Sequence, residues 1–242
     1  MLKSITEPEV CAACRPIIIG DAKELRRQAL ALSLPCDYCV LSESDLISED
    51  SLDPVIYDTG DAGGQAQWGC LSADAGRAAI AAIEAGVKLC LSGKLDAIAT
   101  APINKESLKL AGSRFPGHTE MLTSLCGASR SLMCFFAGDL RVFLLTIHMS
   151  LADAIKAITK ERVADSILLA DRELRRFGIP RPRIAVAGLN PHAGEHGLFG
   201  SEEAREIEPA IEECRAQHKI QVSGPFPADT LFVRAARGEF DA

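Results

Sequence analysis

Three of the five histidines in the chain lie in loops or at the end of an apolar segment, where a side chain can meet a ligand. His118 follows a Pro-Gly pair, His192 lies in the Gly- and Pro-containing segment Gly188–Glu195, and His148 follows the apolar run Val142–Ile147. Neutral imidazole binds divalent metals, and protonated imidazole binds anions. This pattern favours a metal site or an anionic-substrate site over three unrelated surface histidines.

The densest group of polar side chains lies in the segment Gly188–Glu203. An apolar strand-like segment ends there, a stiff loop follows, and a helix is expected next. Helix N-termini bind anions, and a loop histidine can bind a metal. A plain strand-to-helix connection is the alternative, but four ionisable or amide groups within seven residues favour a site: Asn190, His192, Glu195 and His196.

Two further groups have both a functional and a structural interpretation. Lys105 and His118 are able to contact an anionic substrate, and the Thr119 hydroxyl is able to donate to a phosphate or carboxylate. Lys105 is alternatively a solvated helix residue and Thr119 an N-cap. Asp229 either caps a helix or orients a metal-binding histidine, and His148 taken alone fits a core histidine.

The chain has nine cysteines, an odd number that argues against a disulfide framework. Cys90, Cys126 and Cys134 lie in apolar segments and are expected to be buried. The pairs Cys11-x-x-Cys14 and Cys36-x-x-Cys39 have zinc-ribbon spacing. Both pairs adjoin strand-like segments and neither contains the usual glycine, so a zinc ribbon is the less favoured interpretation.

The bulk composition indicates a globular protein of one large or two small domains. The 242 residues are 48% hydrophobic, and the net charge is -7. An acidic surface argues against nucleic acid or an anionic membrane as the main partner. The apolar runs are far shorter than the roughly 20 residues that span a bilayer, and no signal-peptide pattern is visible, so a cytoplasmic protein is expected.

Strand-like and helix-like segments alternate along the chain, which is typical of an α/β fold. Strands are expected at residues 15–20, 38–41, 96–100, 131–136, 141–146 and 183–187. Helices are expected at residues 21–32, 72–85, 119–126, 151–177 with a break at Thr159, and 201–217. Asp21 with Glu24, and Ser201, are the expected helix caps. Residues 42–67 have no clear pattern, and residues 224–230 are expected to form a rigid loop. The chain begins inside a helix and stops where a strand would start, so both ends look incomplete.

Five segments together resemble the 4-hydroxythreonine-4-phosphate dehydrogenase family, in the family's order: residues 99–108, 115–122, 146–151, 188–203 and 224–232. The resemblance implies an isocitrate- or isopropylmalate-dehydrogenase-like fold, with two α/β/α domains and a cleft between them. The expected domains are residues 1–113 and 114–242. The resemblance also implies a homodimer with shared active sites.

The resemblance further implies a reaction. NAD, or NADP, oxidises the 3-hydroxyl of 4-phosphohydroxy-L-threonine, and the keto acid loses carbon dioxide to give 3-amino-2-oxopropyl phosphate, a step toward pyridoxal phosphate. A divalent metal (Zn, Mg, Co or Mn) suits this chemistry as a Lewis acid. His118 and Thr119 match substrate-binding residues of the family, and His148 and His192 match two of its three metal ligands.

The sequence also departs from the family's pattern. The opening strand with its Gly-rich loop, the third metal histidine and the cofactor loop are not found in these residues, so no catalytic or cofactor-binding residue is assigned. His196 stands where the family usually has glycine. Three alternatives remain open: a dehydrogenase of 4-phospho-D-threonate or -erythronate, a dehydrogenase of a dihydrodiol dicarboxylate, and a non-catalytic chain that binds metal or phosphate.

Overall fold

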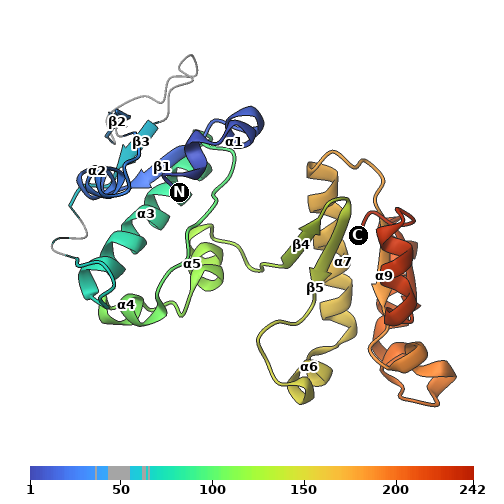
Figure 1. Ribbon diagram of the computed structural model, residues 1–242. Coiled ribbons are helices and arrows are strands. Elements are labelled where there is room, and N and C mark those ends of the chain that lie inside the picture. Colours follow the sequence, from blue (N-terminus) through green and yellow to red (C-terminus); the bar gives the residue numbers. More distant parts are fainter. Residues whose placement is uncertain (36, 43–54, 62–63, 65) are drawn as a thin grey trace. The chain divides into compact units, whose positions relative to one another are not determined.

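The computed structural model describes residues 1–35, 37–42, 55–61, 64 and 66–242. These residues form two compact units, Met1–Ser131 and Leu132–Ala242 (Figure 1). The division lies after the boundary expected at residue 113. The reason is that α5 (His118–Leu125) packs against α3 (Ala73–Leu91) and shares its apolar core through the buried Met121.

A parallel sheet of three strands forms the centre of the first unit. Its order is β1 (Ile17–Gly20), β3 (Val55–Asp58), β2 (Cys39–Leu41). The first and last of these strands were expected from the sequence. The central strand was not, because it lies in the polar region that had no clear pattern. Its first three residues are almost fully buried, as a strand covered on both faces requires.

The helices of the first unit begin largely where the sequence indicates. Before them come η1 (Ser4–Thr6) and α1 (Pro8–Ala13). The carboxylate of Asp21 accepts hydrogen bonds from the backbone amides of Lys23 and Glu24 in the first turn of α2 (Ala22–Ala31), as expected of a cap. Ser72 likewise caps α3, which continues past the expected end at Ala85 to Leu91.

The expected strand at residues 96–100 is wrong, because that segment forms no β-bridge within the described residues. Its apolar side chains serve a different packing role. Ile98 belongs to the core shared by α3 and α5, and its side chain lies against Gly86 of α3. The apolar character of this segment therefore comes from burial against a helix. A short apolar run does not by itself distinguish such a segment from a strand.

The second unit contains two pairs of strands and the helices that cover them. Its elements are β4 (Met133–Ala137), β5 (Leu140–Leu144), α6 (Leu151–Ala157), α7 (Lys160–Arg176), β6 (Arg183–Ala187), η2 (Pro191–Gly197), η3 (Glu203–Ile207), α8 (Glu208–His218), β7 (Gln221–Phe226) and α9 (Ala228–Ala236). The antiparallel hairpin β4–β5, the helix break at Thr159 and the bounds of β6 are confirmed.

The core of the second unit lies between α7, α8 and the parallel pair β6–β7. Leu174, Ala210 and Cys214 are fully buried there. Burial raises the pKa of the Cys214 thiol to about 11, so this cysteine behaves as a small apolar side chain. Of the cysteines expected to be buried, Cys90 and Cys134 are partly exposed and Cys126 is exposed, because the apolar pattern of a segment does not fix the orientation of each member.

Residues 224–230 do not form the expected loop. Residues 224–226 complete β7, and α9 begins immediately after Pro227, which is its N-cap residue. Asp229 therefore lies inside the first turn and does not cap the helix; its carboxylate accepts a hydrogen bond from the next backbone amide, that of Thr230.

Candidate active site

The segment between β6 and α8 is organised around the buried carboxylate of Glu203, which is only 3% exposed. One of its oxygens accepts hydrogen bonds from the backbone amides of Leu189 (2.8 Å) and Asn190 (2.6 Å). The other accepts a bond of 2.8 Å from the side-chain amide of Asn190. Glu203, at the start of η3, thus holds Leu189 and Asn190, the first residues of the loop, through its side chain.

The charge of Glu203 is stabilised by these donors. Burial by itself would raise the pKa of the Glu203 carboxyl, but the hydrogen bonds from Asn190 and Leu189 outweigh it and hold the pKa below its usual value. The same Asn190 nitrogen also lies 2.8 Å from an oxygen of Glu202, and this bond lowers the pKa of that carboxyl as well. Both carboxyl groups are ionised at neutral pH.

Three glycines allow this close packing. A Cβ atom on Gly188 would lie 2.8 Å from the backbone of Ala193, and one on Gly194 would lie 2.8 Å from the Glu203 carboxylate. A Cβ on Gly200 would lie 2.4 Å from the side-chain nitrogen of Asn190. A larger residue at Gly188 would therefore displace backbone, and a larger residue at Gly194 or Gly200 would displace the side chain of Glu203 or Asn190.

The backbone from His192 to His196 is left-handed at five successive residues, with φ between 42° and 80°. Only Gly194 among them is a glycine, and a left-handed conformation costs other residues roughly 1–2 kcal/mol each. His196, which stands where the related family usually has glycine, has φ 57°. His148 shares the conformation, with φ 52°. Residues held in this region of φ are concentrated at functional sites.

Both histidines matched to metal ligands lie in the second unit with exposed side chains. His148 follows β5, and His192 follows β6 in the left-handed turn, where its ring contacts Phe199 at a centroid distance of 6.0 Å. Imidazole nitrogens of this kind are suitable donors for a divalent metal. Among the residues that the structure describes, no group of three or more His, Cys, Asp or Glu side chains forms a ready metal site.

In the first unit, the structure brings together two segments singled out in the sequence. Asn104 caps α4 (Lys105–Leu110), and the side chain of Lys105 extends toward the start of α5. Its Cε atom lies 3.7 Å from the point that a Cβ on Gly117 would occupy. The Lys105 side chain therefore lies near the backbone just before His118, and a carboxylate oxygen of Glu120 lies 3.6 Å from the same point.

His118 and Thr119 are the first two residues of α5, and Gly117 is the N-cap residue. The interpretation of Thr119 as a plain N-cap is therefore wrong, and its side chain is exposed. The Nε2 atom of His118 is buried and has no hydrogen-bond partner within the described residues. A buried ring nitrogen without a partner is unusual, and a bound ligand would satisfy it.

The expected cap at Ser201 differs from the structure, and the less favoured zinc-ribbon pairs are only partly described by it. Ser201 is not the cap of the last long helix; a π-helical turn, η3, starts that helix, and the side chains of Glu202 and Glu203 point back to the loop. In the first zinc-ribbon pair, Cys11 donates to the carbonyl of Ile5 and Cys14 to that of Val10. The second pair contains Cys36, which lies outside the described residues.

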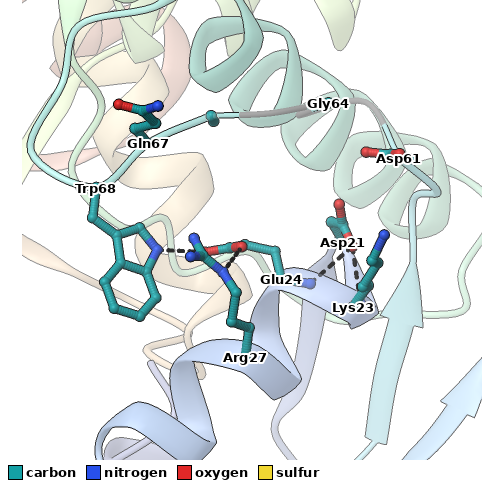
Figure 2. Close-up of a pocket in the computed structure, with 9 residues that line it drawn as sticks. Asp21, Lys23, Glu24, Arg27, Asp61, Gly64, Gln67 and Trp68 are labelled. Atoms are coloured by element: carbon teal, nitrogen blue, oxygen red, sulfur yellow. Dashed lines mark hydrogen bonds and ion pairs between the residues drawn. The ribbon is translucent and has the colours of Figure 1, made fainter.

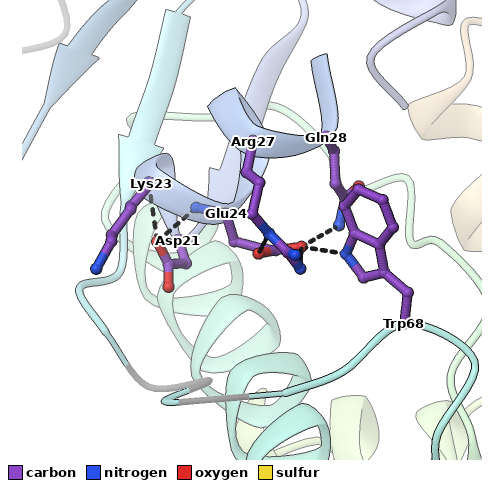
Figure 3. A network of polar contacts seen from close by, with 6 residues as sticks. All are labelled: Asp21, Lys23, Glu24, Arg27, Gln28 and Trp68. Carbon is purple, nitrogen blue, oxygen red and sulfur yellow. Dashed lines mark hydrogen bonds and ion pairs between the residues drawn. The ribbon is translucent and has the colours of Figure 1, made fainter. Parts of the chain in front are cut away.

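A pocket of about 430 Å³ in the first unit was not expected from the sequence (Figure 2). It lies at the N-terminus of α2 and is bordered by residues 66–68. Figure 3 shows its central network, in which Glu24 accepts hydrogen bonds from Arg27, Gln28 and the indole of Trp68. Arg27 also stacks 4.2 Å from the centre of the Trp68 ring. Glu24, Arg27 and Gln28 have helical spacing, but nothing in the sequence pairs them with a tryptophan 44 positions away.

The strands and helices define an α/β protein, as expected, and comparisons with known proteins give its family and its dehydrogenase-type fold. The model of the pyridoxal phosphate biosynthetic protein PdxA matches residues 12–242, and the chain belongs to this family. Its members named among the relatives are oxidoreductases, so the expectation of an enzyme of this class is confirmed.

Relatives with two different names are similar to the chain over nearly all of its length. A D-threonate 4-phosphate dehydrogenase of Cupriavidus necator is 43% identical over 100% of this chain and 72% of the relative. A 4-hydroxythreonine-4-phosphate dehydrogenase of Geobacter metallireducens is 41% identical over 99% and 70%. The crystal structure of a 4-hydroxythreonine-4-phosphate dehydrogenase from Burkholderia phymatum superposes with a TM-score of 0.89 at 43% identity, over 99% of this chain and 73% of that one.

Within the described residues, no helix is both long and apolar enough to cross a bilayer.

Proposed function

We propose that this protein oxidises the 3-hydroxyl of a four-carbon, 4-phosphorylated hydroxy acid, using NAD or NADP and a divalent metal. Membership of the family supports the dehydrogenase class, and the names of its relatives support a phosphorylated hydroxy-acid substrate. The observation that carries the proposal to particular residues is the buried Nε2 of His118, which has no hydrogen-bond partner within the described residues. The side chain of Lys105 approaches Gly117, the residue that precedes this histidine.

Lys105, His118 and Thr119 would bind the anionic substrate. Lys105 supplies a fixed positive charge, and the ring of His118 and the hydroxyl of Thr119 supply directional hydrogen bonds. Binding of this kind orients the substrate and contributes mainly to KM. The start of α5 adds the favourable end of its helix dipole for a negative group.

His148 and His192 would hold the metal, because their imidazoles are exposed and have the right donor chemistry. A bound nicotinamide cofactor would supply a hydride acceptor, and a metal held by these histidines would supply Lewis-acid chemistry at the substrate's oxygens. Both residues share a left-handed backbone, which sets the direction of each Cα–Cβ bond. Two histidines form an incomplete ligand set, so the proposal requires a further ligand from elsewhere in the active enzyme. A homodimer with shared active sites is part of the proposal.

Two substrates are candidates. The first is 4-phosphohydroxy-L-threonine, whose product decarboxylates to 3-amino-2-oxopropyl phosphate. The second is D-threonate 4-phosphate, favoured by the relative of that name at 43% identity. They differ in the group at C2, an amine in one and a hydroxyl in the other, while the phosphate that Lys105 and His118 would contact is common to both.

The deciding experiment compares kcat/KM for the two substrates and for a dihydrodiol dicarboxylate, with NAD and with NADP, in the presence of Zn, Mg, Co or Mn. A clear preference for one phosphorylated acid is expected, with activity abolished by a chelator and by His192→Ala. If neither phosphorylated acid is turned over in the presence of a metal, the proposal is rejected. The alternative is then a chain that only binds metal or phosphate.

A further inference from the structure

Glu203 is a buried anion without a cation. Within the described part of the chain, no Lys, Arg or His side chain forms an ion pair with it, although it is only 3% exposed. A buried carboxylate in such surroundings needs several hydrogen-bond donors to offset its lost hydration. Its donors include the backbone amides of Leu189 and Asn190 and the side-chain amide of Asn190, immediately before the turn that carries His192, together with its own backbone amide.

The hydrogen bonds from Leu189 and Asn190 tie the Glu203 carboxylate to the loop that precedes its helix. The turn η3 has no capping hydrogen bond from a side chain, so this carboxylate does not act as an N-cap. It instead faces the loop, where a Cβ on Gly194, in the middle of the left-handed turn, would lie 2.8 Å from it. The carboxylate thus contacts the turn at both its entry and its centre.

From these contacts we infer that Glu203 is the positioning residue of the loop that carries His192. Its ionised carboxylate holds the entry of the turn at Leu189 and Asn190 and supports Gly194, so that the direction of the His192 imidazole is set by a group that does not touch the ligand. The inference rests on the proposed function insofar as His192 binds metal.

Glu203→Gln tests this role with little change of shape. The glutamine oxygen is still able to accept from the two backbone amides, but its NH₂ group faces the NH₂ group of Asn190, and two donors repel. Glu208→Gln is the matched control, because it makes the same change at an exposed residue on the adjoining helix, α8. Asn190→Ala removes the hydrogen bond between the Asn190 side chain and Glu203 by truncating the donor. This variant replaces Glu203→Gln in the test if Glu203→Gln does not fold.

Two measurements on the 242-residue chain test whether Glu203 positions His192. In NMR spectra, Glu203→Gln and Asn190→Ala are expected to shift the ring resonances of His192 and the amide resonance of Leu189, whereas Glu208→Gln leaves them unchanged. In titrations with Co²⁺, both variants are expected to bind about tenfold more weakly or worse, the range found for residues that orient metal ligands. A lowered melting temperature with unchanged His192 resonances and unchanged Co²⁺ affinity would overturn the inference and leave Glu203 a stability residue.

His192→Ala separates the two proposals. If it leaves the affinity for Co²⁺ unchanged, the metal role proposed for His192 fails, and the positioning role is then decided by the His192 and Leu189 resonances of the other two variants. If it abolishes Co²⁺ binding while Glu203→Gln alters neither the resonances nor the affinity, the metal role stands and the positioning role fails.

Discussion

The side-chain nitrogen of Asn190 lies 2.8 Å from Oε2 of the buried Glu203. The second proton of the same nitrogen goes to Glu202, also at 2.8 Å, so one neutral amide holds two carboxylates in place. Two negative groups this close repel each other, and the amide between them offsets that repulsion. The loop that carries His192 depends on this residue being an amide.

Asn190→Asp is therefore expected to lower the free energy of unfolding by about 2–3 kcal/mol at pH 7. It replaces a charge-assisted hydrogen bond by a third carboxylate. In the wild type, the depressed pKa of Glu203 means that its contribution to stability is present above the usual carboxyl pKa and is lost as the pH falls through the folded value. The difference in free energy of unfolding between the variant and the wild type should thus be largest at neutral pH and smaller in acid. Urea denaturation at pH 7 and pH 4 measures this difference.

Asn104→Asp provides the control. Asn104 caps α4 by accepting a hydrogen bond from the amide of Ser107, and aspartate caps a helix as well as asparagine does. This variant is expected to stay within about 0.5 kcal/mol of the wild type. If both variants lose the same free energy of unfolding, the repulsion from Glu202 and Glu203 does not explain the effect of Asn190→Asp.

His196→Gly is expected to stabilise the protein slightly. His196 has φ 57°, and relief of that conformation is worth roughly 1–2 kcal/mol. Glycine also gives the unfolded chain more freedom, which costs about 0.4–1 kcal/mol. The net gain should be about 0.5–1 kcal/mol and is measurable by chemical denaturation. His218→Gly, at the end of α8, makes the same change in helical backbone and should destabilise; stabilisation by both would contradict the explanation from φ.

The sequence predicted most of the elements that have a strong local pattern. The strand Arg183–Ala187, the hairpin around Gly138 and the helix starts at Asp21 and Thr159 depend on residues close together in the chain. The central strand β3 was missed because its apolar run is short and stands in a polar region. The expected strand at 96–100 was wrong because burial against a helix gives the same apolar pattern.

The candidate site divides in the same way. The sequence singles out the histidines and Lys105 as candidates because their residue types are chemically distinctive and lie near Gly and Pro. The role of Glu203 was not found, since it depends on a carboxylate meeting amides 13 and 14 positions earlier in the chain. The sequence showed acidic residues at a helix start, and their simplest interpretation was an interaction with the helix dipole. Only the three-dimensional structure shows that they turn toward the loop.

Gly76→Ala is expected to destabilise the first unit strongly. A Cβ at this position of α3 would lie 2.1 Å from the backbone oxygen of Ser107 in α4, so the two helices would have to separate. Overpacking of this kind costs about 1–3 kcal/mol or more. Gly86→Ala is the control on the same helix, because its Cβ would meet only the side-chain ends of Ile19 and Ile98 at 3.3 Å. Thermal unfolding should show a clearly larger loss for Gly76→Ala, and similar losses would contradict the close backbone approach.

His118→Ala is expected to raise KM for the phosphorylated substrate about tenfold or more with a smaller change in kcat, because the proposed role of this residue is substrate binding. His218→Ala removes an exposed histidine of the second unit and should change neither constant. Steady-state kinetics over a range of substrate concentrations separates the two constants. An effect on kcat alone would assign His118 to the chemical step.

The network at Glu24 provides a spectroscopic test in the first unit, because Trp68 is the only tryptophan of the chain. The hydrogen bond from Arg27 is the main reason that the pKa of the Glu24 carboxyl falls to about 2, with further bonds from Trp68 and Gln28. Its usual value is near 4.5, so the stabilising effect is present above that pH and is lost as the pH falls toward 2.

Glu24→Gln should accordingly change the fluorescence of Trp68 already at pH 7. The neutral side chain no longer offers a charged acceptor to the indole, and the emission is expected to shift to longer wavelength as the ring becomes more exposed. Between pH 5 and pH 2 the wild type should approach the emission of the variant, whereas the variant changes little. Glu106→Gln, at an exposed position of α4, is the control and should behave as the wild type does. Identical acid titrations of Glu24→Gln and the wild type would show that another carboxyl group controls the environment of Trp68.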